Sequence, residues 1–302
     1  MTDKPSTTRI ASIAVFASAS LWGLYWLPLR YLEQHGVAGG WAVALLNLPA
    51  APVLLPVIAY YWQRHGYQRW LRAAGIIGLF TGLGLAFYGI GLVHTSVVRA
   101  TMLFYLTPVW ATIIGIAWLG EHAGLSRWLA IGAGLIGLAL LLSGGGSTPV
   151  NIGDLFALLS GVFWAVGAAA IMRYADVPLP LMTAIQFFVT SVAAVLLGSS
   201  FGGDQLPAAA DLLSMLPLGS LIAIGLFLPG IGLIFWAQKI LFPGRVGLLM
   251  MSEALVAVIS ASLLLPEETL SLLQWSGAAL IITACLLEVL LSPEQTIGAT
   301  QR

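Results

Sequence analysis

Long apolar runs separated by short polar breaks fill almost the whole chain. A bilayer core is about 30 Å thick, so a helix needs about 20 apolar residues to cross it. Lipid offers the backbone no hydrogen bonds, and runs of this length therefore cross it as helices. The pattern predicts an all-α integral membrane protein with ten transmembrane helices over residues 10–32, 39–61, 71–92, 97–118, 126–143, 152–172, 180–199, 214–238, 245–265 and 271–291.

Two stretches in opposite halves of the chain resemble each other. Residues 99–121 read RATMLFYLTPVWATIIGIAWLGE, and residues 245–267 read RVGLLMMSEALVAVISASLLLPE. Both begin with arginine, end with glutamate and precede another apolar run. Internal similarity on this scale is typical of transporters with a duplicated half. We therefore predict two five-helix repeats, over residues 10–143 and 152–291, with a central linker at 144–151.

Basic residues indicate how these helices are oriented. With the N-terminus inside, ten of the twelve Lys and Arg residues lie on the inner side and only Arg30 and Arg99 on the outer side. Because basic loops stay cytoplasmic, both termini are expected in the cytoplasm. Five helices per repeat is an odd number, so the second repeat would insert upside down. Glu121 would then face the cytoplasm and Glu267 the outside.

Composition supports a membrane setting and excludes several classes of protein. Of 302 residues, 59% are hydrophobic and 8% charged, against about 25% charged in ordinary soluble domains. A net charge of zero argues against a nucleic-acid partner. Cys285 is the single cysteine, so no intrachain disulfide can form. Ala17–Ser18–Ala19 could be a signal-peptidase site, but the apolar run continues to Leu32, long enough to span the membrane.

No enzyme motif was found in the sequence. The four histidines fall at loops or helix ends on opposite sides of the predicted membrane, where they cannot share one metal ion. Gly-x-Ser-x-Gly, His-Glu-x-x-His and the nucleotide-binding Gly-rich loop are all missing. We expect no enzymatic activity, cofactor, metal or obligate protein partner; the expected partners are a small-molecule substrate and membrane lipids.

Glycines and prolines suggest where helices pack closely or bend. Gly78 and Gly82 form a small-xxx-small step, which in membranes lets two helices approach closely. Pro108 and Pro229 fall inside predicted spans and should kink or break those helices.

A few polar residues lie near mid-membrane. Glu253 is the clearest, since an ionisable group there costs roughly 3 kcal/mol and usually faces a cavity or a partner. It could contact a polar or cationic part of a substrate, carry a proton, or bond to a neighbouring helix; Ser252 adjoins it. Asn47 and Gln186 occupy equivalent helices of the two repeats and could be ligand contacts or interhelical bonds.

Aromatic side chains are the other candidates for a binding site. Trp22, Trp164, Tyr105 and Trp110 lie near mid-span, either as packing residues or as the lining of a pocket for an amphipathic or aromatic solute. Tyr88 and Trp236 lie nearer the two faces and are candidates for gates. The predicted substrate-binding set is Trp22, Asn47, Tyr88, Tyr105, Trp110, Trp164, Gln186, Trp236, Ser252 and Glu253.

The segments YLTPVWATIIGIAWLGE and SEALVAVISASLLLPEE, with Trp22–Gly23 near the start, resemble the paired EamA repeats of the drug/metabolite transporter superfamily. Within it the chain is most similar to the YddG-type aromatic amino acid exporters. This resemblance implies a ten-helix fold around a central cavity and export of aromatic and other amino acids and small metabolites. Ala254 and Thr107 depart from the family pattern, as does Asn47, which stands where many relatives carry a basic residue.

The sequence thus favours a bacterial inner-membrane exporter of amino acids or small metabolites that works by alternating access. A carrier of other solutes such as drugs, a passive solute channel and a structural or sensory membrane protein are the alternatives.

Overall fold

The computed structural model describes residues 4–65, 68–95, 97–141, 143, 150–264 and 271–291. Within these residues the regular structure is helical and no strand occurs, which confirms the all-helical prediction. The elements are α1 (Lys4–Trp22), α2 (Trp26–Gln34), α3 (Gly39–Asn47), α4 (Ala50–Val53), α5 (Leu55–His65), α6 (Gln68–His94), α7 (Val97–Phe104), α8 (Thr107–Leu119), α9 (Leu125–Leu141), α10 (Ile152–Arg173), α11 (Leu179–Leu197), η1 (Gly198–Gly202), α12 (Ala209–Ile222), η2 (Ala223–Phe227), α13 (Leu228–Gln238), α14 (Pro243–Met250), α15 (Ser252–Leu264) and α16 (Leu272–Leu291).

Six stretches of the described chain are long and apolar enough to cross a membrane. They are Thr7–Gln34, Gly39–Arg64, Trp70–His94, Ile152–Arg173, Leu179–Phe201 and Ala209–Gln238. The predicted spans 97–118, 126–143, 245–265 and 271–291 correspond to shorter helical segments. Glu267 and most of the predicted linker, residues 144–149, lie outside the described residues. The described helices are those of a multi-pass membrane protein.

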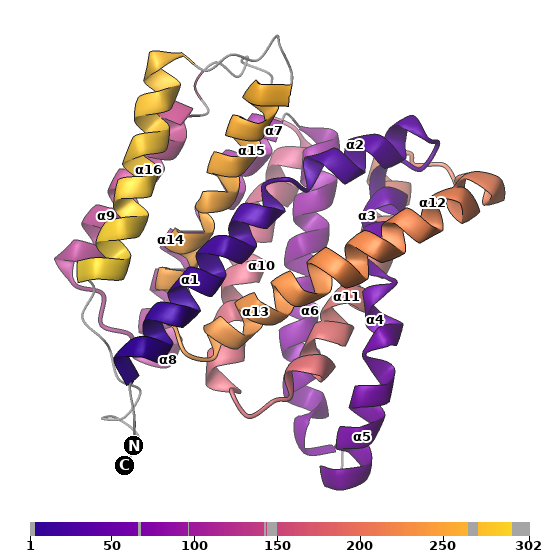
Figure 1. Cartoon of the computed structure of the whole chain (residues 1–302), viewed down its shortest axis with the longest axis horizontal. Coiled ribbons are helices and arrows are strands. Elements are labelled where there is room, and N and C mark those ends of the chain that lie inside the picture. Colours follow the sequence, from indigo (N-terminus) through magenta and orange to yellow (C-terminus); the bar gives the residue numbers. More distant parts are fainter. Residues whose placement is uncertain are drawn as a thin grey trace.

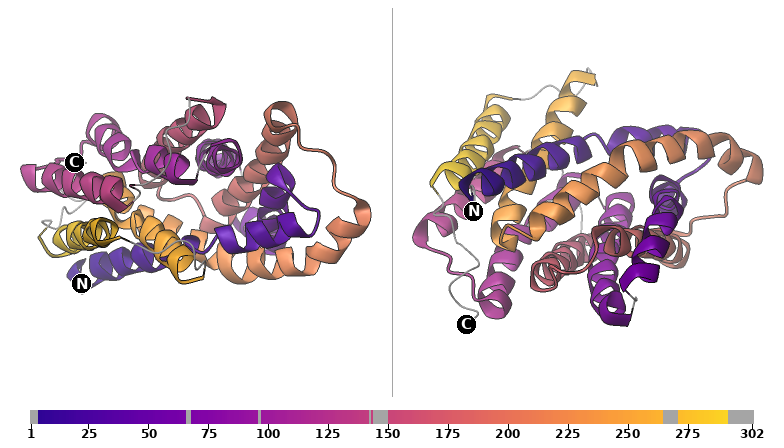
Figure 2. Two further views of the ribbon diagram at one scale, coloured as in Figure 1. Left: turned by 90° about the horizontal axis from the view of Figure 1, so that it is seen from above. Right: turned by 60° about the horizontal axis from the view of Figure 1, so that its bottom comes forward.

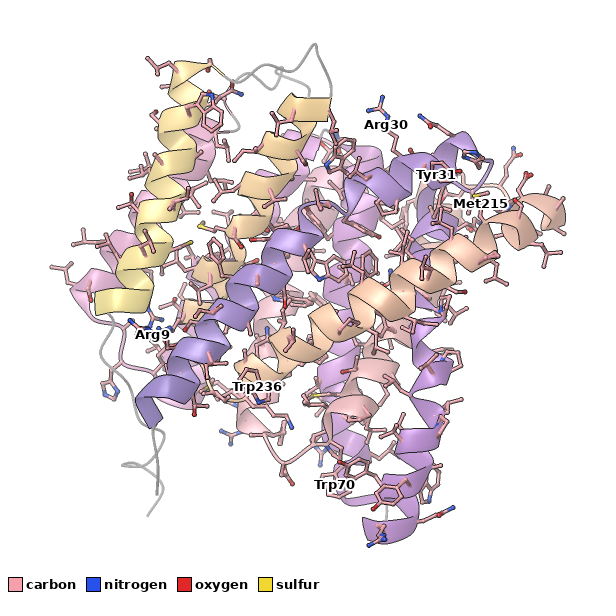
Figure 3. All side chains as sticks on the ribbon, in the orientation of Figure 1. Arg9, Arg30, Tyr31, Trp70, Met215 and Trp236 are labelled. Atoms are coloured by element: carbon pink, nitrogen blue, oxygen red, sulfur yellow. The ribbon has the colours of Figure 1, made fainter. Side chains whose placement is uncertain are left out.

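The helices run between two ends of one bundle. Arg30 lies at the upper end in Figure 3, on α2, and we call this the Arg30 end. α1 begins and α16 finishes at the opposite end, where the α8–α9 connection also lies (Figure 1). We call that the Arg127 end, after the residue near the start of α9.

Close packing of glycines joins the helices, as the sequence suggested. α6 lies against α10 and α11, and a Cβ at Gly78 or Gly82 would collide with Ile185 or Val189 of α11. α9 and α16 lie side by side at one edge of the bundle (Figure 2), with Gly277 against the backbone of α9. Small side chains therefore set the interhelical distances at these contacts.

Prolines interrupt several helices. α7 and α8 are separated at Tyr105 and Leu106, just before Pro108, as predicted. Pro229 stands in the first turn of α13 and follows the π-helical segment η2, so the predicted distortion there is also confirmed. The predicted helix 39–61 is divided into α3, α4 and α5 around Pro49 and Pro52, because proline lacks the N–H group that a continuous helix requires.

Two further breaks occur without proline. The predicted helix 10–32 is interrupted between Trp22 and Trp26, where Gly23 packs against α15; a Cβ on Gly23 would lie 2.5 Å from the Glu253 carbonyl oxygen. α14 and α15 separate at Met251, and the Tyr105 hydroxyl donates to the neighbouring Met250 carbonyl over 3.0 Å. That bond satisfies a carbonyl at the end of a helix.

A buried ion pair lies at the Arg127 end. Arg127 Nη1 is 2.8 Å from Glu121 Oε1, and the two side chains are 9% and 0% exposed. Gly115 of α8 and Gly244 of α14 pack closely around the pair, since a Cβ on Gly115 would collide with Glu121 Oε2 and one on Gly244 would lie 3.0 Å from Arg127 Nη1. At the same end, burial lowers the pKa of Lys239, while the nearby Asp176 carboxylate opposes that shift.

Candidate functional site

A cavity of about 310 Å³ extends from the buried Glu253 to the exposed side chains of Arg30 and Glu33. This volume lies at the lower end of the range of about 300–1,000 Å³ that is usual for small-molecule sites. The wall is built from α1 and α2 with the break between them, together with α3, α6, α7 and α15. Its residues are Trp22, Gly23, Tyr25, Trp26, Leu29, Arg30, Glu33, Gly39, Val43, Tyr88, Gly89, Leu92, Val93, Thr101, Glu253, Ala254 and Ala257.

A second void of about 20 Å³ lies against the deep end of this cavity. Trp22, Tyr88 and Glu253 line both spaces. The remaining residues of the smaller void come from α6, α7, α10, α13 and α14, and they include Trp164. The three shared side chains thus form the boundary between the two spaces.

Glu253 is the second residue of α15, directly after the break at Met251, and it is 7% exposed. The hydroxyl groups of Tyr88 and Tyr105 interact with its carboxyl group. Tyr105 is fully buried and also bonds to the Met250 carbonyl, so it fixes the turn that presents Glu253. The deep end of the cavity therefore offers one carboxyl group with two phenolic partners.

An aromatic cluster forms the wall beside this carboxyl group. Trp22 stacks on Phe227 of η2 with ring centroids 4.4 Å apart, and Tyr25 packs against both rings. Trp26 is held by a hydrogen bond of 3.1 Å from its indole nitrogen to Ser260 Oγ of α15. These contacts fix flat apolar surfaces next to Glu253, suited to an aromatic or alkyl group.

Tyr25 also brings a buried hydroxyl group to this wall. Its hydroxyl lies next to the Asn47 side chain, whose amide nitrogen donates to the Val43 carbonyl over 2.7 Å. The Tyr25 hydroxyl is thus a polar group of the cavity wall, whereas Asn47 lines neither space.

The predicted site residues divide into two groups. Trp22, Tyr88 and Glu253 line the main cavity, and Trp164 lines the smaller void. Ser252 instead donates to the Phe16 carbonyl of α1. The predicted residues that line neither space are Asn47, Tyr105, Trp110, Gln186, Trp236 and Ser252.

Gln186 and Trp236 lie away from the cavity. Gln186 bonds to Thr190, whose hydroxyl donates to the Gly82 carbonyl, and this chain joins α11 to α6. Trp236 lies in the lower half of the view in Figure 3, on α13, far from Arg30 at the top.

Tyr25, Trp26 and Thr101 line the cavity but are not among the residues predicted from the sequence. The first two follow Trp22 by three and four positions, a spacing that places side chains on one face of a helix. That spacing could have indicated them. Thr101 carries no comparable signal, because threonine is common in membrane helices as a packing residue.

The apolar helices and the solute-sized cavity together define a multi-pass membrane protein with an internal binding site. The model of the EamA-like transporter family matches residues 9–143 and 151–290, so the chain belongs to this family. Membership indicates transport of small solutes across a membrane.

A curated relative and a solved structure illustrate the similarity of the chain to individual proteins. The uncharacterized transporter YvbV of Bacillus subtilis (strain 168) is 26% identical over 298 residues, which cover 92% of this chain and 90% of that protein. A solved structure, described only as a crystal structure of a protein, matches with a TM-score of 0.70 and 20% identity over 93% of this chain and 99% of the other. At that identity the likeness concerns the fold alone.

Proposed function

We propose that this protein exports aromatic and other amino acids, or small metabolites, across the bacterial inner membrane by alternating access. The observation that carries the proposal is the cavity itself, which holds a buried carboxyl group and is flanked by fixed aromatic rings. Its walls come from both stretches that match the family model: α2, α3, α6 and α7 belong to the first and α15 to the second.

In this proposal the chain comprises ten spans in two inverted repeats, residues 10–143 and 152–291, with both termini in the cytoplasm. The Arg30 end is then the outer end, and the present conformation opens outward. Transport requires a second conformation in which the same site opens at the Arg127 end. The helix breaks at Tyr105 and Met251 support the proposed relation between the two repeats. These two residues coincide when Arg99 is aligned with Arg245.

We expect the purified protein in liposomes to catalyse saturable uptake and counterflow of labelled tryptophan, whereas protein-free liposomes do not. Saturation and counterflow are the signs of a carrier with one site. Flux that rises linearly with concentration would instead indicate a channel. If no amino acid gives saturable flux while a drug or another metabolite does, the transport class stands and the amino acid proposal is wrong.

A further inference from the structure

We infer that the deep end of the cavity is a site for a protonated amine joined to an aromatic ring, so that amines lacking a carboxylate are substrates. This inference rests on the proposed function, because it assigns a substrate class to the same cavity. It goes further in stating that the ammonium group, and not the carboxylate of an amino acid, is the charged group recognised.

Charge is distributed unevenly along this cavity. Glu253 is the acidic residue among the described residues at its deep end, and its described partners are the uncharged hydroxyls of Tyr88 and Tyr105. Arg30 is the basic residue among those lining the cavity, and it is exposed at the other end beside Glu33. Removing a carboxylate from water is costly unless a positive charge lies close by. A solute ammonium group would supply the positive charge that none of the described lining residues supplies at this depth.

The ring system next to Glu253 fits the rest of such a solute. Trp22 lines both the main cavity and the smaller void, and its stacking on Phe227 keeps the ring in place. A cation beside a tryptophan face gains cation–π attraction, and an attached aromatic ring gains stacking contact. An aryl-alkylamine can place its ammonium group on Glu253 and its ring against this wall at the same time.

An anionic group of a solute gains little binding free energy at the deep end of the cavity. If the ammonium group of an amino acid contacts Glu253, its carboxylate must point toward the hydrated end of the cavity, because the basic lining residue lies there. The carboxylate is therefore tolerated without being recognised, and a solute that carries only a carboxylate would meet Glu253 as a like charge.

Three indole compounds with similar side chains separate these contributions: tryptamine carries only the ammonium group, tryptophan carries both groups, and indole-3-propionate carries only the carboxylate. We expect the full-length protein in detergent, followed by calorimetry at neutral pH, to bind tryptamine at least as tightly as tryptophan. Tryptamine should bind at least about tenfold more tightly than indole-3-propionate, a difference of about 1.4 kcal/mol. Equal binding of tryptamine and indole-3-propionate, or no binding of tryptamine, would overturn the inference.

The variant Glu253→Gln keeps the size of the side chain and removes its charge. It should reduce the preference for tryptamine over indole-3-propionate to about twofold or less. Asp176→Asn is the control, since Asp176 is an exposed carboxylate that lines neither space, and this variant should keep the preference. A Glu253→Gln protein that retains the full preference would refute the assignment to this residue. The wild-type panel decides the question even if the variant does not fold.

The outcomes also separate this inference from the proposed function. Saturable tryptophan flux in liposomes, combined with no preference for amines, would leave the proposed function intact and refute the inference. Tryptamine transport without transport of any amino acid would support the inference and refute the proposed export of amino acids.

Discussion

Replacing Arg127 with methionine is expected to lower the free energy of unfolding by about 3–5 kcal/mol, the usual cost of leaving one member of a buried ion pair without the other. The Glu121 side chain is fully buried, and Arg127 Nη1 lies 2.8 Å from its Oε1. Without the guanidinium group, the Glu121 carboxylate stays buried against Gly115, where water cannot solvate it. Reversible denaturation in mixed detergent micelles measures the change.

Two further variants show whether the pair itself is responsible. Glu121→Gln combined with Arg127→Met removes both charges and should recover more than half of the lost stability, because the uncompensated charge is gone. Arg72→Met removes an exposed arginine of α6 and should leave the free energy of unfolding nearly unchanged. An Arg127→Met protein as stable as the wild type would mean that Glu121 finds another partner or takes up a proton.

The helices were predictable because their signal is local. Apolar runs of membrane-spanning length mark the helices, and Pro108 and Pro229 mark two of the distortions. The break at Gly23 has a different origin, since it depends on α15, which is remote in sequence. The break at Met251 likewise depends on a bond from Tyr105 in the other half of the chain. Neither cause can be read from the residues around the break.

The candidate site was only partly predictable, for a related reason. A polar residue at mid-membrane depth must find a partner, but the sequence does not say whether that partner is a cavity or another helix. Glu253 lies in the cavity wall, while its neighbour Ser252 bonds to α1 and Gln186 to Thr190. The direction in which each side chain points follows from the rotation of its helix, and only packing against the neighbouring helices fixes that rotation.

Gly23→Ala is expected to damage both the fold and the site. An added Cβ would lie 2.5 Å from the Glu253 carbonyl oxygen, 2.7 Å from Val256 Cβ and 2.9 Å from the Ala257 nitrogen. Two of these atoms are backbone atoms of α15, so that helix or the α1–α2 break must move. Overpacking of this kind costs about 1–3 kcal/mol. Because α15 carries Glu253 and the α1–α2 break carries Tyr25, and both residues line the cavity, tryptophan affinity should also fall at least about tenfold, the ratio that about 1.4 kcal/mol produces.

Gly75→Ala is the matched control, because it adds the same atom to a glycine of α6 whose Cβ position has no atom within 4 Å apart from its chain neighbours and the nearby backbone of its own helix. It should raise the stability by up to about 1 kcal/mol through helix propensity and leave tryptophan binding unchanged. Calorimetry with tryptophan and denaturation of both variants supply the comparison. If Gly23→Ala lowers stability but keeps its affinity, the close approach of α1–α2 to α15 supports the fold without positioning Glu253. If it changes neither, the two segments are not in contact in the protein's resting state, and the cavity described above must have a different wall.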